Sequence, residues 1–596
     1  MSTTKTHPVA IVGGGPVGLS ASILFSLRNI PHVRFERHPG TSIHPKACGI
    51  NQKTGEIFRQ MGVKEEVYTN PAPQNTCSKT AWFTSLGPTG RKIVSRDAWG
   101  GGAYADEYKA ASPSRYAMLP QIRLEPILAQ RTKKLNPDGV NFGAEVTDLV
   151  ERKDHVELRV KYKDCSRAIK IIKASYVVAA DGGRLVSDKL GIELHGEKDI
   201  VDMVTAHIRA PIAAQHPEPQ AFITWFINPE MGGSIGTGYM YHLGPYPNKP
   251  ETEEWIFACG ILPDDPKKFD DAAMIARLKR SINIPDLQVE VPSLSHWFVN
   301  AISAERYRSE QGRVFLVGDA AHRVPPWGAL GLNTGVQDAN NLAWKLALML
   351  EGKLGTGDLL NTYDEERRPV GERVAKSSLI NLQSHNMIID KALGMSKSTS
   401  VTENMKAVEV LFDKSHPDHA QMHADLQKAQ SILDTELKAP GAEVGWFYPI
   451  ADVYNEGQDN LHDGQLDEHG NLNTGKYCPS TIPGHHLPHM WLRKGDRIVS
   501  TRDLLALNNF ILFTANPTAW ENVRNAMIDI VAIDNDDWID VDRKWRQLSG
   551  VGDEGAVLVR PDGIVAWRSK STEGNNAEEM ATVLAKVLRL PSLSEP

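Results

Sequence analysis

Apolar residues recur along the chain with two different periods, and these separate it into regions. Near the amino end, a short apolar run at 9–12 and a second strand-like run at 32–35 flank a segment whose apolar positions have helical spacing, namely Leu19, Ile23 and Leu27. A third run at 314–317 precedes another segment with the helical period, which begins near Asn333. Short apolar runs that each lead into a helix are typical of buried strands in a parallel sheet. We therefore predict an α/β unit assembled from segments far apart in the sequence.

Residues 200–300 show a different pattern, in which strand-like runs are separated by Pro and Gly turns. The runs lie at 203–208, 221–227, 238–242 and 255–262. Short connections between strands predict a mostly antiparallel sheet inserted into the α/β unit. The two-residue period of a strand places Tyr239 and Tyr241 on one face of this sheet and His242 on the other. Residues 141–163 also alternate and predict a hairpin or meander.

The last part of the chain repeats the α/β pattern on a smaller scale. Residues 401–440 predict a helical linker, and beyond them the order is strand, helix, strand, hairpin and helix, at 510–514, 518–527, 528–533, 556–567 and 577–588. These patterns divide the chain into a first α/β domain in two parts, an inserted sheet, the linker and a second α/β domain. The first α/β domain is predicted at 1–195 and 298–400, with a substrate-sheet insertion near 80–110, and the inserted sheet itself at 196–297. The linker is predicted at 401–440 and the second α/β domain at 441–596.

Length and charge narrow the class of protein. At 596 residues the chain exceeds one ordinary core, so several domains are expected. With 66 Lys and Arg against 73 Asp and Glu, the net charge is −7 and no long basic run occurs, which argues against nucleic acid and anionic membranes as partners. The amino end lacks a secretory apolar core, and no run of about 18 uninterrupted apolar residues occurs. We therefore expect a cytoplasmic protein without a membrane span.

Cysteine and histidine usage gives no sign of a disulfide framework or a metal site. The cysteines are odd in number and widely spaced, which predicts reduced thiols: Cys48, Cys77, Cys165, Cys259 and Cys478. Three histidines lie close together in the sequence, at 485, 486 and 489. Pro488 breaks any helix that would align them, and no carboxylate or cysteine cluster accompanies them, so we expect no bound metal.

The first candidate site follows the apolar run at 9–12. This run leads into a G-x-G-x-x-G turn that opens a helix, with residues Gly13, Gly15, Pro16, Val17 and Gly18. Such glycines let a pyrophosphate approach the backbone and the amino end of the helix. Glu36 ends the second strand, where a carboxylate can accept a hydrogen bond from a ribose hydroxyl. These residues predict a dinucleotide site and fit both FAD and NAD.

The second candidate site follows the run at 314–317, which ends at Gly318 and Asp319. A carboxylate therefore lies at the carboxyl end of a strand, where open α/β sheets bind ligands. Pro325 and Pro326 stiffen the next loop, and the helix near Asn333 turns its free N–H groups toward the same place. A ligand with a polyol tail and a flat heterocycle that bears carbonyls suits both groups, because its hydroxyls can donate to the carboxylate and its carbonyls can accept from the N–H groups.

The segment GDAAHRVPPWGALGLNTGVQDANNLAWKL resembles the second flavin-binding motif of the FAD-dependent aromatic hydroxylases, single-component monooxygenases that include para-hydroxybenzoate hydroxylase and phenol hydroxylase. HPKACGINQKT resembles the segment beneath the flavin in the phenol and dichlorophenol hydroxylase branch, and residues 441–596 resemble its thioredoxin-like tail, here without a dithiol. Ala329 stands where many members carry a second Gly. The resemblance implies an α/β fold: an FAD-binding Rossmann-like βαβ domain with an inserted, mostly antiparallel substrate sheet, plus a carboxyl-terminal thioredoxin-like domain.

The resemblance also implies residue roles. It assigns FAD contacts, through the ribityl chain, the isoalloxazine ring or the adenosine, to Glu36, Arg37, Lys46, Ala47, Gln121, Val146, Asp181, Asp319, Pro326, Gly331, Leu332 and Asn333. It assigns the substrate pocket to Pro325, Cys48 and some of Tyr239, Tyr241 and His242. The motif that begins at Asp181 normally serves nicotinamide as well, but here Leu185 to Asp188 replace its usual Ser and basic residue.

The implied activity is hydroxylation of a phenolic ring. Reduced nicotinamide, as NADPH or NADH, reduces FAD, O2 adds to the flavin, and the resulting hydroperoxide transfers a hydroxyl group to the ring. A phenol of pKa about 10 needs a base to ionise, and the sequence does not identify one. The alternatives are Baeyer–Villiger oxygenation of a polyketide ring, a flavin oxidase or dehydrogenase, and a non-catalytic nicotinamide-binding regulator. We expect a homodimer.

Overall fold

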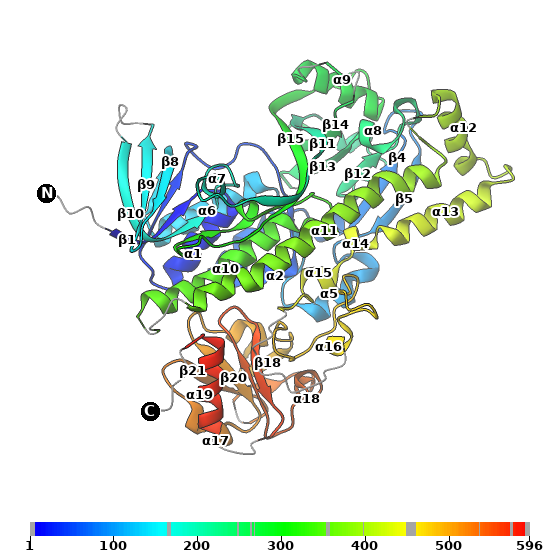
Figure 1. The fold of residues 1–596 in the computed structure, drawn as a ribbon. Coiled ribbons are helices and arrows are strands. Elements are labelled where there is room, and N and C mark those ends of the chain that lie inside the picture. The colour runs from blue at the N-terminus through cyan, green and yellow to red at the C-terminus, as the bar shows by residue number, and fades with distance from the viewer. Residues whose placement is uncertain are drawn as a thin grey trace.

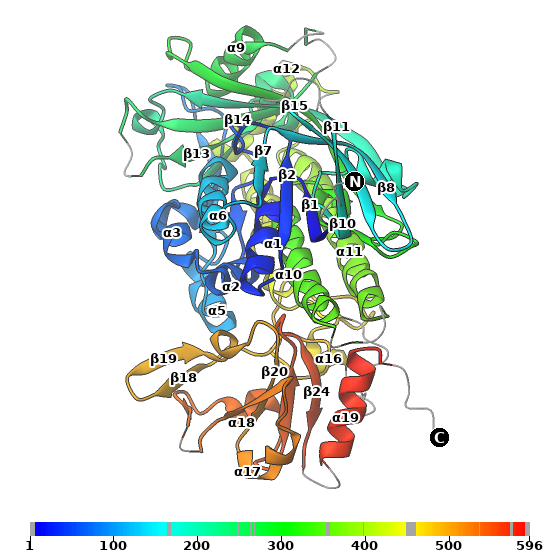
Figure 2. The same ribbon diagram turned by 90° about the vertical axis from the view of Figure 1, so that its left-hand side faces the viewer.

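The computed structural model divides the chain into three regions (Figures 1 and 2). In Figure 2 a large antiparallel sheet lies at the top, a parallel sheet with its helices in the middle, and the carboxyl-terminal domain at the bottom. The described residues are 6–163, 169–246, 249–262, 265–266, 269–352, 354, 358–396, 398–448, 461–535, 537–571 and 576–590. Cys165, residue 397, and residues 449–460 of the predicted tail lie outside them.

The middle region is built on a sheet of seven strands, in the order β7-β2-β1-β10-β9-β8 with β16 also paired to β10. Its strands are β1 (Thr6–Val12), β2 (His32–Glu36), β7 (Val140–Phe142), β8 (Ala144–Glu151), β9 (Val156–Tyr162), β10 (Ile169–Ala179) and β16 (Val314–Leu316). The strands β7, β2, β1, β10 and β16 run parallel, whereas β8 and β9 form the predicted antiparallel meander. The segments predicted to share a parallel sheet therefore do so.

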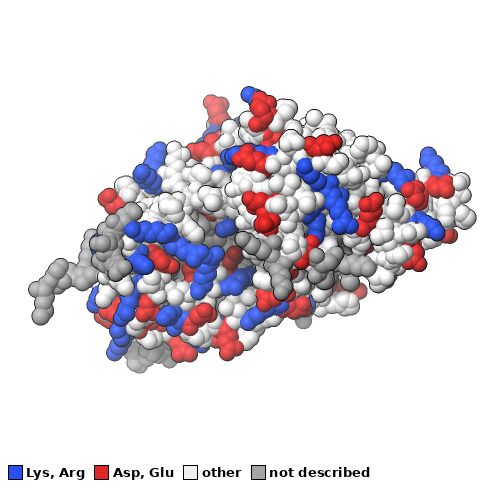
Figure 3. Space-filling model, turned by 90° about the horizontal axis from the view of Figure 1, so that it is seen from above, with Lys and Arg blue, Asp and Glu red and all other residues white. Residues whose placement is uncertain are grey.

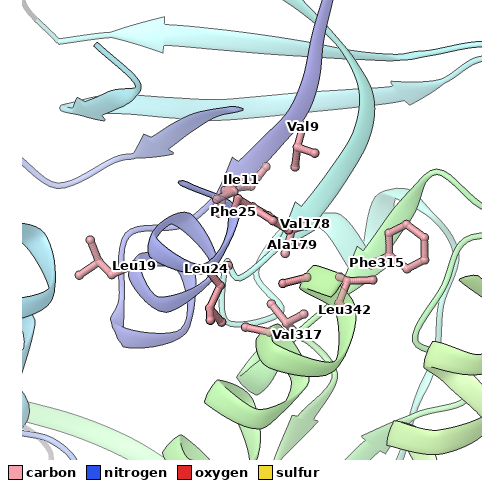
Figure 4. Close-up of a cluster of buried hydrophobic side chains, with 14 of the residues drawn as sticks. Val9, Ile11, Leu19, Leu24, Phe25, Val178, Ala179, Phe315, Val317 and Leu342 are labelled. Atoms are coloured by element: carbon pink, nitrogen blue, oxygen red, sulfur yellow. The ribbon is translucent and has the colours of Figure 1, made fainter. Parts of the chain in front are cut away.

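Three helices cover this sheet: α1 (Pro16–Leu27), α6 (Gln121–Leu135) and α10 (Gly331–Leu350). Figure 4 shows the core between them, where side chains of β1, α1, β10, β16 and α10 meet. Ile11, Leu24, Val178 and Leu342 in this core have no exposed surface. Burying one such side chain stabilises the fold by roughly 1.5 to 3 kcal/mol. The core thus fixes α1 and α10 against the carboxyl ends of β1 and β16.

The top region is a sheet of eight strands, in the order β17-β15-β11-β14-β13-β12-β4-β5, and only β12 and β4 pair in parallel. The strands are β4 (Lys79–Phe83), β5 (Lys92–Asp97), β11 (Leu194–Arg209), β12 (Ile223–Phe226), β13 (Tyr239–Gly244), β14 (Glu254–Gly260), β15 (Glu290–Ala304) and β17 (His322–Arg323). Strands β4 and β5, at residues 79–83 and 92–97, belong to this sheet. The pattern missed the long strand β15, and it placed the start of β11 too late. Helix α9 (Asp271–Ile282) packs on one face through Met274, Leu278 and Ile282.

Other helices connect these layers. They are α2 (Gln52–Met61), α3 (Lys64–Thr69), α4 (Gln74–Cys77), α5 (Ala105–Ala111), α7 (Val186–Lys189), α8 (Ser234–Thr237), α11 (Asn361–Ala392), α12 (Val401–Phe412), α13 (His419–Ile432), α14 (Asp434–Leu437) and α15 (Pro440–Glu443). Helix α11 has 32 residues and runs from the middle region to the top region (Figure 1). A two-stranded ladder of β3 (Gly49–Ile50) and β6 (Ala117–Met118) lies between the regions.

The carboxyl-terminal domain has a four-stranded mixed sheet in the order β21-β20-β23-β24. The strands of this sheet are β20 (Phe510–Thr514), β21 (Ile528–Ala532), β23 (Ala556–Val559) and β24 (Val565–Ser569), and the domain also contains the helices α17 (Pro517–Trp520), α18 (Trp545–Ser549) and α19 (Asn576–Val587). A smaller sheet consists of β18 (Trp491–Lys494), β19 (Arg497–Ser500) and β22 (Ile539–Asp540). The helix predicted at 518–527 is wrong in length, because a 3-10 turn, Glu521–Val523, follows α17. The predicted fold class is confirmed.

Buried ion pairs fasten this domain to the middle region. Arg560 donates to both oxygens of Glu366, at 2.6 and 2.9 Å, and to Asp562 at 2.6 Å. Lys345 of α10 also donates to Glu366, at 2.7 Å. These cations hold the pKa of Glu366 well below its usual range despite its burial. The tail therefore packs against the main body through buried charges.

Charged residues of both signs lie on the face of the molecule seen from above. Figure 3 shows Lys and Arg interspersed with Asp and Glu over the described residues of the upper face. Among the helices that the structure describes, none combines the length and the apolar character that a membrane span requires.

Candidate functional site

The turn between β1 and α1 forms the first cradle. Gly13 has φ +114°, and a Cβ on it would lie 2.2 Å from the carbonyl oxygen of Ala180; a Cβ on Gly18 would lie 2.4 Å from the Gly13 oxygen. Both positions therefore require glycine. The Cβ position of Gly15 faces open space, and among the described residues no side chain caps the amino end of α1. Free N–H groups next to open space fit a pyrophosphate.

Glu36 and Arg34 lie beside this turn. The Glu36 carboxylate accepts hydrogen bonds from the N–H groups of Gly14, at 2.6 Å, and His38, at 2.8 Å. Arg34 is fully buried 4.8 Å from the Phe142 ring, and its guanidinium nitrogens have no hydrogen-bond partner among the described residues. Burial lowers the pKa of Arg34 to about 10. A buried cation whose N–H groups lack hydrogen-bond acceptors is costly, and a bound anion would relieve this cost.

The second cradle is the turn after β16, where Asp319 lies exposed in the 3-10 turn Gly318–Ala320. Asp338 of α10 holds this turn in place, because its buried carboxylate accepts from the N–H of Gly318 at 3.0 Å and from Arg367 at 2.7 Å. His322 lies 2.9 Å from the same carboxylate. Because Asp338 is already bonded, Asp319 is the carboxylate of this turn that remains available to hydroxyl groups of a ligand.

The amino end of α10 faces the segment 44–51. No side chain caps α10 within the described residues, so the N–H groups at Gly331 and Leu332 are available to a ligand. The Asn333 side chain is buried; it accepts from the N–H of Asn51 at 3.0 Å and donates to the carbonyls of Gly49 at 2.9 Å and Ala329 at 2.6 Å. The Asn333 side chain thus ties the two segments together and leaves its backbone for ligand contact.

The segment 46–48 forms hydrogen bonds with two other predicted site residues, Gln121 and Tyr241. The N–H of Gln121 donates to the Ala47 carbonyl at 2.8 Å, and the Tyr241 hydroxyl donates to the Lys46 carbonyl at 2.9 Å. Burial raises the pKa of the Cys48 thiol to about 12, so this thiol is neutral at physiological pH. The structure therefore brings together Lys46, Ala47, Cys48, Gln121 and Tyr241 between the two cradles and the top sheet.

Two predicted contacts have clear local roles. Asp181 accepts hydrogen bonds from four successive N–H groups, those of Gly183 to Val186 at 2.8 to 3.2 Å, and so shapes the turn before α7. Val146 lies on β8 with its side chain in the core, and a β-bulge follows it. Only the backbone of Val146 is thus placed to contact a ligand.

A small, partly open cavity lies where the top sheet, α11 and the loop before α10 meet. Its walls are Val201, Met203, Trp225, Ser234, Gly238, Tyr239, Ala258, Cys259, Trp327 and His385. The Trp225 ring lies 4.6 Å from the Tyr239 ring and 3.8 Å from the His385 ring, centroid to centroid. Trp327 belongs to the loop that joins Asp319 to α10. The cavity is therefore aromatic and adjoins the second cradle.

Comparison with known proteins identifies the chain. Residues 6–378 match the family described as FAD binding domain, and residues 480–591 match the family described as aromatic-ring hydroxylase, C-terminal. The chain belongs to the FAD-dependent aromatic-ring hydroxylases. The predicted family, the monooxygenase class and the use of FAD with NAD(P)H are confirmed.

Several relatives match this hydroxylase over nearly its whole length. A putative polyketide hydroxylase of Streptomyces halstedii is 31% identical over 98% of this chain and 97% of its own, and phenol 2-monooxygenase of Pseudomonas sp. (strain EST1001) is 29% identical over 97% and 92%. The solved structure of the flavin-dependent monooxygenase PieE in complex with FAD and substrate has 32% identity and a TM-score of 0.89, covering 98% of this chain and 100% of that one. Aklavinone-11 hydroxylase with FAD and aklavinone has 25% identity and a TM-score of 0.77, over 99% and 100%.

The residues of the two cradles fit FAD. Gly15 and the uncapped end of α1 leave room for the pyrophosphate, and the unpartnered Arg34 adds a cation there. Asp319 is free for the ribityl hydroxyls, and the amino end of α10 for the ring carbonyls. Arg37 is exposed next to Glu36, and Pro326 is exposed in the loop before α10. The individual FAD contacts of this hydroxylase stay predictions.

Of the predicted pocket residues, only Tyr239 lines the cavity itself. Tyr241 lies on the same face of β13 and contacts the segment beneath the flavin site, and Pro325 is buried two positions before Trp327. Of the three residues from which the pocket was predicted to draw some members, His242 does not line this cavity. The strand period turns His242 to the opposite face, where its ring packs 4.5 Å from Trp255, and burial lowers its pKa to about 4.

Sequence reasoning missed His385 and Trp327. His385 lies on α11 without a recognisable motif, and it reaches the cavity only because α11 packs against the top sheet. Trp327 stands inside the flavin motif, where its position between the two prolines and Gly328 was a usable signal. The three tail histidines serve packing: His485 stacks on Phe447, His486 meets Trp446, and His489 bonds Ser500 at 2.8 Å.

Proposed function

We propose that this hydroxylase inserts one oxygen atom of O2 into the ring of a phenolic substrate, with NADPH or NADH as reductant. The observation that carries the proposal is the aromatic cavity, whose wall includes Trp327 from the loop between Asp319 and α10. Asp319 would hold the ribityl chain at one end of this loop and the start of α10 would hold the ring at the other, so a substrate in the cavity would lie against the loop between them.

The chain's own residues bind the cofactor, orient the substrate and exclude water. The glycine turn after β1 holds the pyrophosphate, Asp319 the ribityl chain, and the backbone at Gly331 to Asn333 the ring. Bound FAD supplies the redox chemistry, namely reduction by NAD(P)H and activation of O2. Val201, Met203, Trp225 and Ala258 give the cavity apolar walls that exclude water from the reacting centre.

Of the pocket residues predicted from the sequence, Pro325 and Tyr239 are the proposed contacts that orient the substrate. Pro325 has no N–H, so its carbonyl is a fixed acceptor for a substrate hydroxyl. Burial raises the pKa of Tyr239 above its usual range, so its hydroxyl remains a neutral donor. Cys48 and Tyr241 stand between the flavin site and the sheet, where they complete the wall near the flavin.

Oxygen-isotope labelling tests this function. The purified protein is expected to be yellow with one FAD per chain, and labelled O2 should place one labelled atom on the ring of a phenol. Loss of the label, with peroxide as the sole oxygen product, would support an oxidase instead. A labelled ring ester or lactone would support Baeyer–Villiger oxygenation.

A fused aromatic polyketide is the second candidate substrate, because one relative is described as a putative polyketide hydroxylase and another was solved with aklavinone. A substrate panel from single-ring phenols to anthraquinone phenols separates the two classes. The rate of flavin reduction by NADPH with each compound is the measurement, since the right effector should accelerate it. We also propose the domain boundaries given above and a homodimer, which light scattering of the holoenzyme tests.

A further inference from the structure

Two buried ring nitrogens in the walls of the cavity have no hydrogen-bond partner among the described residues. They are Nε2 of His385 and Nε1 of Trp327. The side chains are almost entirely buried, with residue exposures of 2% and 6%. Leaving a polar group unpaired in the interior costs about 1 to 3 kcal/mol. Because both side chains belong to the cavity wall, a ligand in the cavity can supply the missing partners.

A carboxylate fixes the orientation of the His385 ring. Nδ1 of His385 lies 2.9 Å from Oε2 of Glu436 on α14, and Glu436 is itself buried. A carboxylate accepts hydrogen bonds, so the proton of the neutral imidazole belongs on Nδ1, and Nε2 carries the lone pair. The free lone pair is therefore on the side of the ring away from Glu436.

The helices that carry this pair are joined by a second contact one turn away. Asn381, four residues before His385 on α11, accepts from the Thr435 hydroxyl at 2.7 Å and donates to the Thr435 carbonyl at 3.3 Å. Asn381 also donates to the Trp327 carbonyl at 3.4 Å. The Asn381 side chain thus links α11, one turn before His385, to the loop that carries Trp327.

We propose that His385 is the general base that ionises the phenol, that Glu436 is its positioning residue, and that Trp327 donates its N–H to the resulting phenolate. The O–H bond of the phenol breaks, an N–H bond forms at Nε2, and the electron pair stays on the phenolate oxygen. No electrons are transferred in this step. The assignment rests on the proposed function, and it supplies the base that the sequence did not identify.

The other titratable groups of the cavity do not suit this role. Burial raises the pKa of Tyr239 and, to about 12, that of Cys259, so both are protonated acids at neutral pH. Cys48 is likewise a neutral thiol, and His242 lies on the far face of the sheet. Among the described residues of these walls, His385 is the remaining side chain with a nitrogen that can accept a proton.

A series of phenols of decreasing pKa separates a base from a structural residue. In His385→Gln holoenzyme, hydroxylation of unsubstituted phenol should fall about 100-fold or more, as expected for loss of a general base. The loss should shrink as ring fluorines lower the pKa of the phenol, and it should vanish for phenols that are already ionised at the assay pH. Glu436→Gln should show a smaller loss with the same trend.

His216→Gln is the matched control. His216 is also buried, but its ring nitrogens are bonded to Thr224 at 2.7 Å and Glu218 at 3.0 Å, and it does not line the cavity. This variant should match wild type across the phenol series. A loss in His385→Gln that is equal for all phenols would overturn the assignment, because a packing defect does not depend on the acidity of the substrate. Wild type that hydroxylates no phenol would instead overturn the proposed function.

Binding of 4-nitrophenol to the oxidised holoenzyme gives a readout that does not depend on turnover. Its phenolate is yellow, so difference spectra report the ionisation of the bound ligand. Wild type should bind it as the phenolate at a pH below its solution pKa, whereas His385→Gln should bind it as the neutral phenol. Equal ionisation in both proteins, or no binding to wild type, would contradict the proposal.

Discussion

At the scale of single residues, the carboxylates of the flavin site fall into two groups. Asp181 and Asp338 have their oxygens engaged by protein donors, which shape the turns around the cofactor. Asp319 instead lies exposed at the end of β16. The first group is structural and the second is available to the ligand, a division that the sequence alone does not reveal.

Asp319→Ala should therefore weaken FAD binding while leaving the fold intact. A charge-assisted hydrogen bond contributes about 1.5 to 3 kcal/mol, which corresponds to a loss of affinity of about 10- to 100-fold. Flavin fluorescence titration of the apoprotein measures this change. Asp138→Ala, at another exposed aspartate, is the control, and an unchanged affinity in Asp319→Ala would remove the residue from the site.

Glu443 of α15 gives the hydroxylase a pH-dependent stability. It is buried and accepts a hydrogen bond from the Tyr108 hydroxyl at 2.9 Å, and burial raises its pKa to about 7. The folded state keeps this proton up to about pH 7, whereas an unfolded chain releases it near its ordinary pKa of about 4.3. The contribution is thus fully present below that value and is lost as the pH rises through 7.

Glu443→Gln should remove this dependence. Between about pH 5.5 and pH 8, the free energy of unfolding of the variant should rise relative to wild type by about 2 kcal/mol, since each pKa unit corresponds to about 1.4 kcal/mol. Urea unfolding at both pH values measures the difference. Parallel pH profiles of the two proteins would show that Glu443 is already ionised in the folded state.

At the scale of elements, the loop before α10 connects the flavin site to the substrate cavity. Ala329 in this loop has φ +53°, a left-handed conformation that favours glycine, which explains why glycine is expected there in this family. Its neighbours Pro325 and Pro326 restrict the backbone, and Trp327 faces the cavity. The loop is thus held in one conformation from both sides.

Pro325→Ser should loosen this loop without loss of FAD. NADPH oxidation should continue, but more of it should yield hydrogen peroxide in place of hydroxylated product, because the ring is held less firmly. The ratio of product to NADPH consumed, with peroxide assayed in parallel, is the measurement. Pro285→Ser, at an exposed loop proline, should stay coupled; equal coupling in Pro325→Ser would exclude Pro325 from the site.

The elements that the sequence predicted well are those specified by local pattern. The strands at 9–12 and 314–317 are apolar and followed by glycine-containing turns, so both pattern and motif identify them. Strand β15 was missed because Pro292, Ser293 and Asn300 interrupt its alternation, and its pairing with β11 supplies what local propensity does not. His385 was missed for the same reason, since its partner Glu436 lies 51 residues away.

At the scale of the whole molecule, the three regions depend on one another through buried charges. Arg560 of the tail reaches Glu366 on α11, while Arg367 on the same helix reaches Asp338 beneath the flavin turn. A buried ion pair contributes little net stability when intact, but removing one partner leaves the other charge buried and uncompensated, which is strongly destabilising. The position of the tail is therefore coupled to that of the flavin domain.

Arg560→Met should release the tail. It leaves the buried carboxylates of Glu366 and Asp562 without their shared guanidinium, so we expect a loss of about 3 to 5 kcal/mol in the stability of the interface. Thermal unfolding and limited proteolysis near residues 441–480 measure it. Arg589→Met, which removes an exposed pair with Glu365 at 2.8 Å, should cost less than about 1 kcal/mol. Equal effects of the two variants would show that the buried cluster does not hold the domain.

Helix α11 carries Glu366 and Arg367 near one end and His385 near the other, with unbroken helix between them. Each inserted or deleted residue would rotate one end against the other by about 100°. An insertion between Arg367 and His385 would therefore turn His385 out of the cavity while the ion pairs stayed in place. Descendants of this enzyme can change substrate by exchanging side chains along this helix, but they cannot change its length between these two points without losing either the anchor or the pocket.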